Sequence, residues 1–161
     1  EHGLMLLVMG CDEAQGYGIS KPMPATDLPI WLTNYTPNQE WLHYATKYHS
    51  VKEDKIKLLR LTTQHWFEQF KTKLHSSIEE NAKWPFQNHK KCHHGAWIER
   101  AKKEQLFDEP WLEQLEQAHE HMHHMAHVLT EEHQERSISD ASIKELENAF
   151  DKMNLILGRY E

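Results

Sequence analysis

The sequence predicts a mainly helical protein, an antiparallel four-helix bundle with a connector helix, preceded by a short α/β segment. After residue 35, apolar residues recur at spacings of three and four, which places them on one face of a helix. Glycine and proline are scarce, with six of each in 161 residues, and four of the prolines lie before residue 40. Amphipathic helices joined by short connections bury their apolar faces against one another as a bundle.

Residues 1–35 differ from the rest of the chain because they hold four of the six glycines and show mixed periodicity. We expect residues 3–9 to form the end of a helix that stops at Gly10. Residues 15–20 are predicted to form a short buried strand, and a short helix would follow it.

The helical part is expected to begin with a connector helix over residues 36–50, with Pro37 at its first helical position. A longer helix would begin near Val51 and be broken by residues 83–88, which contain Pro85. Its expected core-facing stripe is Ile56, Leu59, Thr63, Trp66, Phe70, Leu74 and Ile78.

Three further helices complete the expected bundle. One runs from Asn88 to about Lys103, and the next is capped by Asp108. The last begins at Ser139 or Asp140. The core faces of the last two helices are predicted to hold Trp111, Leu112, Leu115, Ala118, Met122, Met125, Ala126, Leu129, Ile143, Leu146, Ala149, Phe150, Met153 and Ile156 or Leu157.

Composition excludes several classes of protein. The net charge of −7 argues against a nucleic-acid surface, which needs a basic stripe. The longest strongly apolar run, residues 4–9, is too short to span a bilayer, and no signal peptide is recognisable. Two distant cysteines, Cys11 and Cys92, form no disulfide framework and indicate a reducing compartment. Because the chain starts with Glu1 rather than Met, we expect a segment of a longer cytoplasmic protein.

Histidine is the compositional outlier, with 14 in the chain and nine of them in residues 89–133. His119 and His123 are spaced i, i+4 on one expected helix face. Cys92 and His65 precede them at intervals of 27 residues, about one helical hairpin each. Imidazole nitrogens and a thiolate suit Zn2+, and four protein ligands with no open position are typical of a structural or sensory site.

Other interpretations of these residues are open from sequence alone. His65 could cover the edge of a neighbouring tryptophan, and Cys92 could be a small buried apolar residue. If Cys92 lies at a helix start, the helix dipole is expected to lower the pKa of its thiol. The rival ligands are His75, His89, His93 and His94, of which the last two neighbour the cysteine. The residues expected on the outer face or behind the ligands are His121, His124 and His127.

Two segments of the chain, which begin at Cys92 and at His119, resemble parts of a known family. The stretch Cys92-His-His-Gly-Ala-Trp resembles the Cys-x-x-Gly-x-Trp signature of the chemoreceptor zinc-binding domain. The stretch His119-Glu-His-Met-His-His-Met-Ala is similar to that family's His-x-x-x-His pair, which is followed three residues later by alanine. The resemblance covers about residues 51–160 and implies a cytoplasmic helical bundle, often dimeric, in which zinc occupancy regulates an attached output domain.

The same resemblance implies the complete ligand set of His65, Cys92, His119 and His123. The order of one histidine, one cysteine and two histidines matches that of the family. One position departs from the pattern. The early histidine of the family is usually followed a turn later by tryptophan, whereas Trp66 comes directly after His65 in this chain.

The first 35 residues resemble a different family. Gly10-Cys-Asp, Gln15-Gly-Tyr-Gly-Ile-Ser-Lys-Pro-Met-Pro-Ala and Trp31-Leu look like the C-terminal end of an EAL phosphodiesterase domain. The residues that hold the catalytic metals in that family lie far upstream, and none of them is in this chain. The resemblance implies a remnant of a TIM-type barrel. We expect this segment to be rearranged, because a single barrel strand cannot pair without its neighbours.

The leading hypothesis is a regulatory zinc-binding sensor module at the C-terminus of a cyclic-di-GMP phosphodiesterase. Its parts would be the barrel remnant (1–35), the connector helix (36–50) and the zinc-binding bundle (51–161). The expected partners are Zn2+, the upstream EAL domain and a second copy of the chain, with no nucleic acid and no membrane contact.

Two alternatives come from other classes of protein. A hemerythrin-like di-iron bundle that binds oxygen is one, because Glu116 and Glu120 each stand three residues before a histidine. A metal-free dimerisation bundle is the other. An enzyme is the least expected, because a catalytic zinc needs an open position and a neighbouring general base.

Overall fold

The computed structural model describes residues 2–11, 13–47, 50–76, 84–85 and 88–160. These residues form seven α-helices and two short 3-10 helices, with no strand among them. The mainly helical class predicted from sequence is therefore confirmed for this part of the chain. The chain divides into two compact units, Glu1–Leu58 and Leu59–Glu161.

The N-terminal unit contains three short α-helices: α1 (His2–Val8), α2 (Leu28–Asn34) and α3 (Gln39–Ala45), with a 3-10 turn over Ala25–Asp27. Helix α1 ends where Gly10 adopts a φ of +88°, as expected, because this backbone conformation favours glycine.

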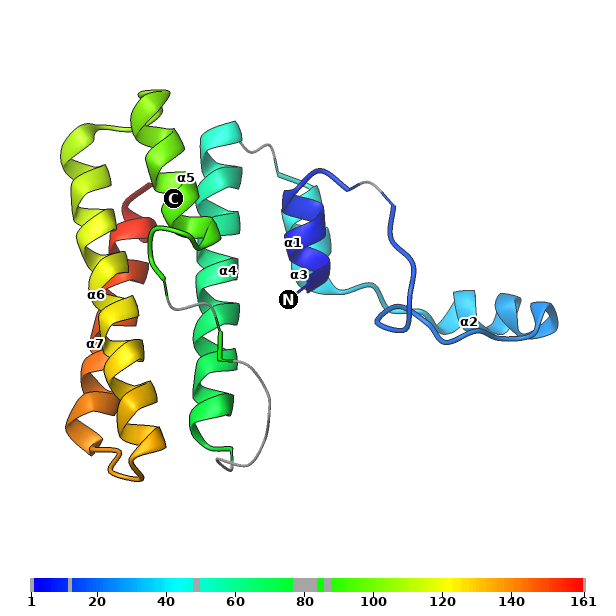
Figure 1. Ribbon diagram of the computed structural model, residues 1–161. Coiled ribbons are helices and arrows are strands. Elements are labelled where there is room, and N and C mark those ends of the chain that lie inside the picture. The colour runs from blue at the N-terminus through cyan, green and yellow to red at the C-terminus, as the bar shows by residue number, and fades with distance from the viewer. Residues whose placement is uncertain (1, 12, 48–49, 77–83, 86–87, 161) are drawn as a thin grey trace. The chain divides into compact units, whose positions relative to one another are not determined.

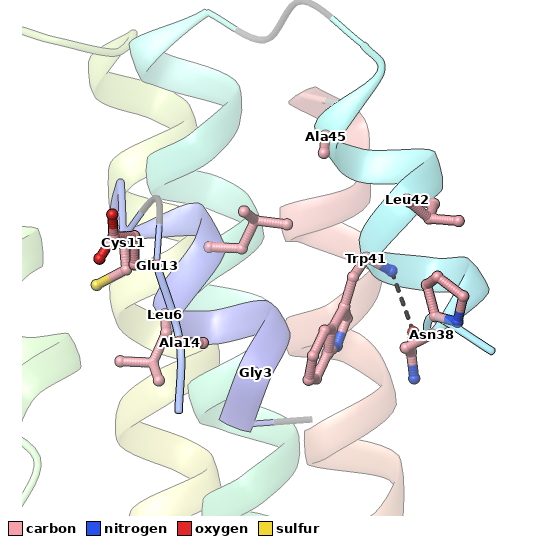
Figure 2. Close-up of a pocket in the computed structure, with 11 residues that line it drawn as sticks. Gly3, Leu6, Cys11, Glu13, Ala14, Asn38, Trp41, Leu42 and Ala45 are labelled. Carbon is pink, nitrogen blue, oxygen red and sulfur yellow. Dashed lines mark hydrogen bonds between the residues drawn. The ribbon is translucent and has the colours of Figure 1, made fainter. Parts of the chain in front are cut away.

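Helices α1 and α3 pack closely within this unit. The indole of Trp41 lies so near Gly3 that a Cβ on the glycine would stand 1.9 Å from the indole Cζ2. The two helices, together with Cys11, Glu13 and Ala14, border a mainly apolar pocket of about 200 Å³ (Figure 2).

The strand predicted over residues 15–20 is wrong. This segment is an exposed turn, in which the carbonyl of Gly16 accepts from the N–H groups of Ile19 and Ser20 at 2.9 and 3.0 Å. Tyr17 is 76% exposed. A strand needs a hydrogen-bonding neighbour, and the described residues provide none, so the glycines turn the chain instead.

The connector predicted as one helix over residues 36–50 is also wrong, because α3 covers only part of it. The side chain of Asn38 caps α3 by accepting from the Trp41 N–H at 3.1 Å, so the helix begins after Pro37. A new helix start follows at Ser50. Its Oγ accepts from the N–H of Glu53 while its own N–H donates to the Glu53 carboxylate, which is a capping box.

Four helices form the larger part of the fold: α4 (Val51–Leu74), α5 (His93–Lys103), α6 (Glu109–Gln134) and α7 (Asp140–Leu157). Within the C-terminal unit these helices lie side by side (Figure 1). The stacked rings of Phe67 and Phe150, with centroids 4.0 Å apart, join α4 to α7. A 3-10 turn, Gly158–Tyr160, follows α7.

The predicted helix starts of α6 and α7 are confirmed. Asp108 accepts from the N–H of Trp111 at 3.0 Å, and Ser139 accepts from the N–H of Ser142 at 3.0 Å. The predicted apolar stripes point inward as well. The buried members are Ile56, Leu59, Thr63, Phe70, Leu74, Trp111, Leu112, Leu115, Ala118, Met122, Ala126, Leu129, Leu146, Ala149, Phe150, Met153, Ile156 and Leu157. Ile78 lies outside the described residues. None of the described helices has the length and apolar character needed to cross a membrane.

Candidate metal centre

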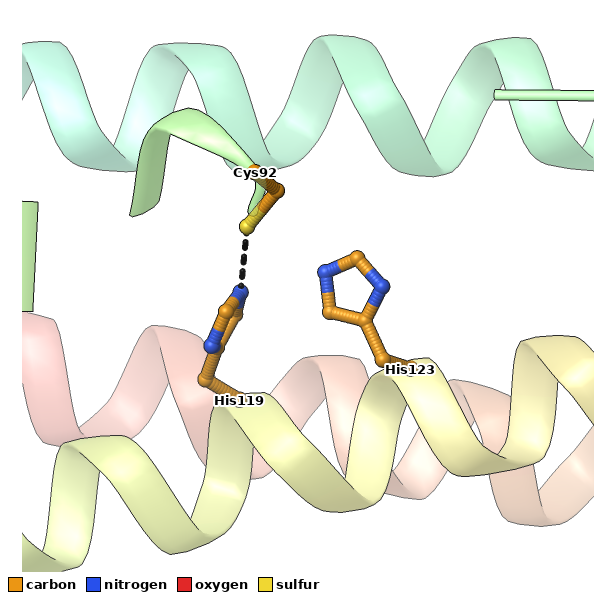
Figure 3. Close-up of side chains that lie close together, drawn as sticks. All are labelled: Cys92, His119 and His123. Carbon is orange, nitrogen blue, oxygen red and sulfur yellow. Dashed lines mark hydrogen bonds between the residues drawn. The ribbon is translucent and has the colours of Figure 1, made fainter. Parts of the chain in front are cut away.

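The structure brings three of the four predicted ligands together. One ligand atom from each of Cys92, His119 and His123 lies within 4.8 Å of the other two (Figure 3). All three side chains are buried, with exposed fractions of 7, 1 and 3%. Such a group of one sulfur and two imidazole nitrogens could hold a metal ion.

Helix α6 supplies the two histidines. Because His119 and His123 are four residues apart, they lie one turn apart on the same helix face, and their ring centroids are 4.6 Å apart. That face is the core face of α6, where Met122 and Ala126 are also buried. The histidines therefore occupy positions that the helical pattern reserves for apolar residues.

The first residues of α5 supply the thiol. Cys92 is the N-cap of this helix, and its Sγ accepts from the N–H of Gly95 at 3.3 Å. A turn held by the side chain of Asn88 leads into the helix, since this side chain accepts from the N–H groups of Lys90 and Lys91. The turn places Sγ 3.1 Å from Nε2 of His119.

Gly95 permits this approach, because a Cβ there would lie 1.9 Å from the carbonyl oxygen of His89. We expect Gly95→Ala to cost about 1–3 kcal/mol of stability and to weaken metal binding at least tenfold, since the backbone before Cys92 must shift. Chemical denaturation and a metal titration would measure both effects. Gly158→Ala is the matched control, because a Cβ there meets no atom within 4 Å. Equal metal affinities in the two variants would contradict this account.

Burial sets the protonation of the site. Desolvation, and then coulombic interactions with the neighbouring imidazoles of His123, His94 and His89, lower the pKa of His119 to about 2, so its imidazole is neutral near pH 7. Neutral imidazole is the form that binds metals.

The expected lowering of the Cys92 pKa is wrong. Burial raises the pKa of this thiol, and it outweighs the hydrogen bonds from the N–H groups of Gly95 and His94, which act in the opposite direction. A metal ion must therefore displace the thiol proton when it binds.

His65, the fourth predicted ligand, is not in the group that the structure assembles. It lies half-buried on α4, where its Nε2 is 2.9 Å from Nε2 of Gln69. Its place in the ligand set stays a prediction. Its neighbour Trp66 contacts the site directly, with a ring centroid 5.0 Å from that of His123.

The remaining histidines around the site differ in their roles. His124 and His127 are exposed, as expected for the outer face of α6, and His121 pairs with Glu145 at 3.0 Å. His89 lies 3.6 Å from a carboxylate oxygen of Glu120, and its ring centroid is 6.4 Å from that of His119.

Sequence reasoning missed the role of His94, which is buried and hydrogen-bonded to α4. Thr63 was the available signal, because it lies in the predicted core stripe of α4, and a threonine there needs a polar partner.

Comparison with protein-family models, with curated proteins and with solved structures gives no match for this chain. The three buried side chains therefore indicate a possible metal centre through their geometry and donor chemistry alone. That donor set contains no carboxylate among the residues that the structure describes.

Proposed function

We propose that this chain is a zinc-binding regulatory module. One observation carries the proposal: a buried thiol and two buried imidazoles converge, with ligand atoms within 4.8 Å of one another. His65 would complete a four-coordinate site with no open position, which is typical of structural and sensory zinc. The motifs at Cys92 and His119 that resemble the chemoreceptor zinc-binding domain support the same assignment.

Zinc is the metal that this donor set favours. Thiolate and imidazole are softer ligands than carboxylate, and together they suit zinc better than magnesium, calcium or a di-iron centre. The di-iron alternative needs bridging carboxylates from facing helices. Glu68 is exposed, Glu116 pairs with Lys102 at 2.6 Å, and Glu120 pairs with His89, whereas Glu79 lies outside the described residues.

The proposed consequence of zinc binding is mechanical. The ion would join the start of α5 to the middle of α6, and α4 contacts the same place through Trp66. Zinc would then shift an equilibrium between two arrangements of an antiparallel bundle, in one chain or in a homodimer, provided that the two arrangements bind it with different affinities. The output domain would be an upstream cytoplasmic EAL phosphodiesterase, as the resemblance of residues 1–35 implies. This segment would have no catalytic activity of its own.

The test is the metal content of the purified chain, measured by inductively coupled plasma mass spectrometry. We expect about one zinc per chain and a large loss in Cys92→Ala, because the variant lacks the thiolate. His124→Ala is the matched control, since this histidine is on the same helix but exposed. Two irons per chain, indifferent to Cys92, would support the oxygen-binding alternative, and the absence of any metal would support a dimerisation bundle.

A further inference from the structure

A second buried histidine connects the metal centre to helix α4. Nε2 of His94 lies 2.9 Å from the hydroxyl of Thr62, 3.1 Å from the hydroxyl of Thr63 and 3.3 Å from the carbonyl oxygen of Leu59. His94 is 7% exposed and Thr63 is fully buried. One ring nitrogen of His94, on α5, thus lies close to three oxygens on one turn of α4.

The direction of these hydrogen bonds follows from their partners. A carbonyl oxygen only accepts, so the Nε2 atom that faces Leu59 carries a proton. The hydroxyls of Thr62 and Thr63 each donate to the same carbonyl, at 3.1 and 2.7 Å, and their lone pairs are directed at the imidazole. His94 therefore acts as a donor with Nε2 protonated, and three oxygens on one turn of α4 define the geometry of this contact.

The same histidine is close to the metal centre. Cys92 is the N-cap of α5 and His94 is its second residue, so both belong to one turn. The ring centroids of His94 and His119 are 5.8 Å apart. A displacement of the Cys92 backbone would therefore reach His94 within a single helical turn.

We propose that His94 is a positioning residue that couples occupancy of the Cys92, His119 and His123 site to helix α4. The proposal rests on the metal-binding function proposed above. In the metal-loaded state the thiolate is held between α5 and α6, and the first turn of α5 then holds His94 against α4. Coupling is reciprocal, so the contact with α4 also strengthens metal binding.

Three variants test the coupling in the full chain. His94→Leu removes the donor, His94→Gln keeps an N–H near the position of Nε2, and the double variant Thr62→Val with Thr63→Val removes the hydroxyls on α4. His93→Leu is the matched control, since this neighbouring histidine is exposed. Zinc affinity is measured by competition with a chromophoric chelator, and hydrogen exchange of the α4 amides is measured with and without zinc.

We expect zinc to slow hydrogen exchange around residues 59–63 in the natural sequence and in His94→Gln. We expect this protection to be lost, and zinc affinity to fall about tenfold, in His94→Leu and in the double threonine variant. A variant that combines His94→Leu with the two threonine substitutions should lose little further zinc affinity, because both changes remove the same contact.

Unchanged zinc affinity and unchanged protection of α4 in His94→Leu would overturn the proposal. If His94→Leu does not fold, as judged by circular dichroism, the double threonine variant decides by the same two readouts. A natural chain that binds no zinc would instead show that the proposed function itself has failed, before any variant is compared.

Discussion

Saturation with Zn2+ is expected to raise the midpoint of thermal unfolding by roughly 15–30 °C relative to the chain in a chelator. A ligand present at a thousandfold above its dissociation constant, and bound only by the folded state, stabilises that state by about 4 kcal/mol. The three donors belong to the unit Leu59–Glu161. For a unit of this size, each kcal/mol of added stability raises the unfolding midpoint by about 4–8 °C. The effect is large because the three donors are already buried and close together.

Calorimetry of the full chain with Zn2+ and with a chelator measures this shift. His119→Ala should abolish it, because the variant removes one of the two ligands that α6 supplies. His127→Ala, an exposed change on the same helix, should preserve it. Identical midpoints with zinc and with chelator would show that the cluster does not bind zinc in the folded chain.

Mild acid is expected to destabilise the metal-free chain. Burial lowers the pKa of His94 to about 4 and that of His119 to about 2, from an ordinary value of 6.5. As the pH falls, the two histidines therefore become protonated in the unfolded chain before they do so in the folded chain. The free energy of unfolding is thus highest above about pH 6.5 and decreases as the pH falls below that value. His94 alone would cost about 3 kcal/mol by pH 4, at 1.36 kcal/mol for each unit of pKa. Domains of this kind have only about 5–15 kcal/mol in total.

The histidine effect is separable from that of the carboxylates. Hydrogen bonds from Ser142 and Ser139 lower the pKa of Glu132, but its ordinary value is 4.5, so it contributes only as the pH falls below that value. Urea unfolding between pH 7.5 and 5 in a chelator therefore isolates the histidines.

His94→Gln should reduce this pH dependence by about half, because glutamine does not titrate whereas His119 still does. His124→Ala should leave it unchanged, since this histidine is exposed. Stability that is independent of pH across this range would refute the assigned burial of the two imidazoles.

Local sequence signals predicted the starts of α6 and α7 and the shared face of two histidines on α6. Asp108 and Ser139 each cap the N–H group three residues later, so their effect depends on a four-residue stretch and is visible in the sequence. The i, i+4 spacing of His119 and His123 likewise guarantees a shared face on any helix. These predictions needed no knowledge of the rest of the chain.

Non-local effects account for the predictions that were wrong. Residues 15–20 carry a strand-like pattern, but a strand exists only with a neighbour to pair with. The pKa of Cys92 depends both on the burial of the thiol by the surrounding protein and on its place at the helix start. Burial has the larger effect here, so the pKa is raised.

The sequence by itself determined the helical class of the described chain, the starts of α6 and α7, and the pairing of two histidines on one face. Each of these follows from interactions between residues three or four positions apart. Only the tertiary structure decided that the Cys92 thiol reaches His119, and that His94 contacts α4 at Leu59. Those contacts span 27 and 35 residues, and they depend on how the helices pack, which no local spacing specifies.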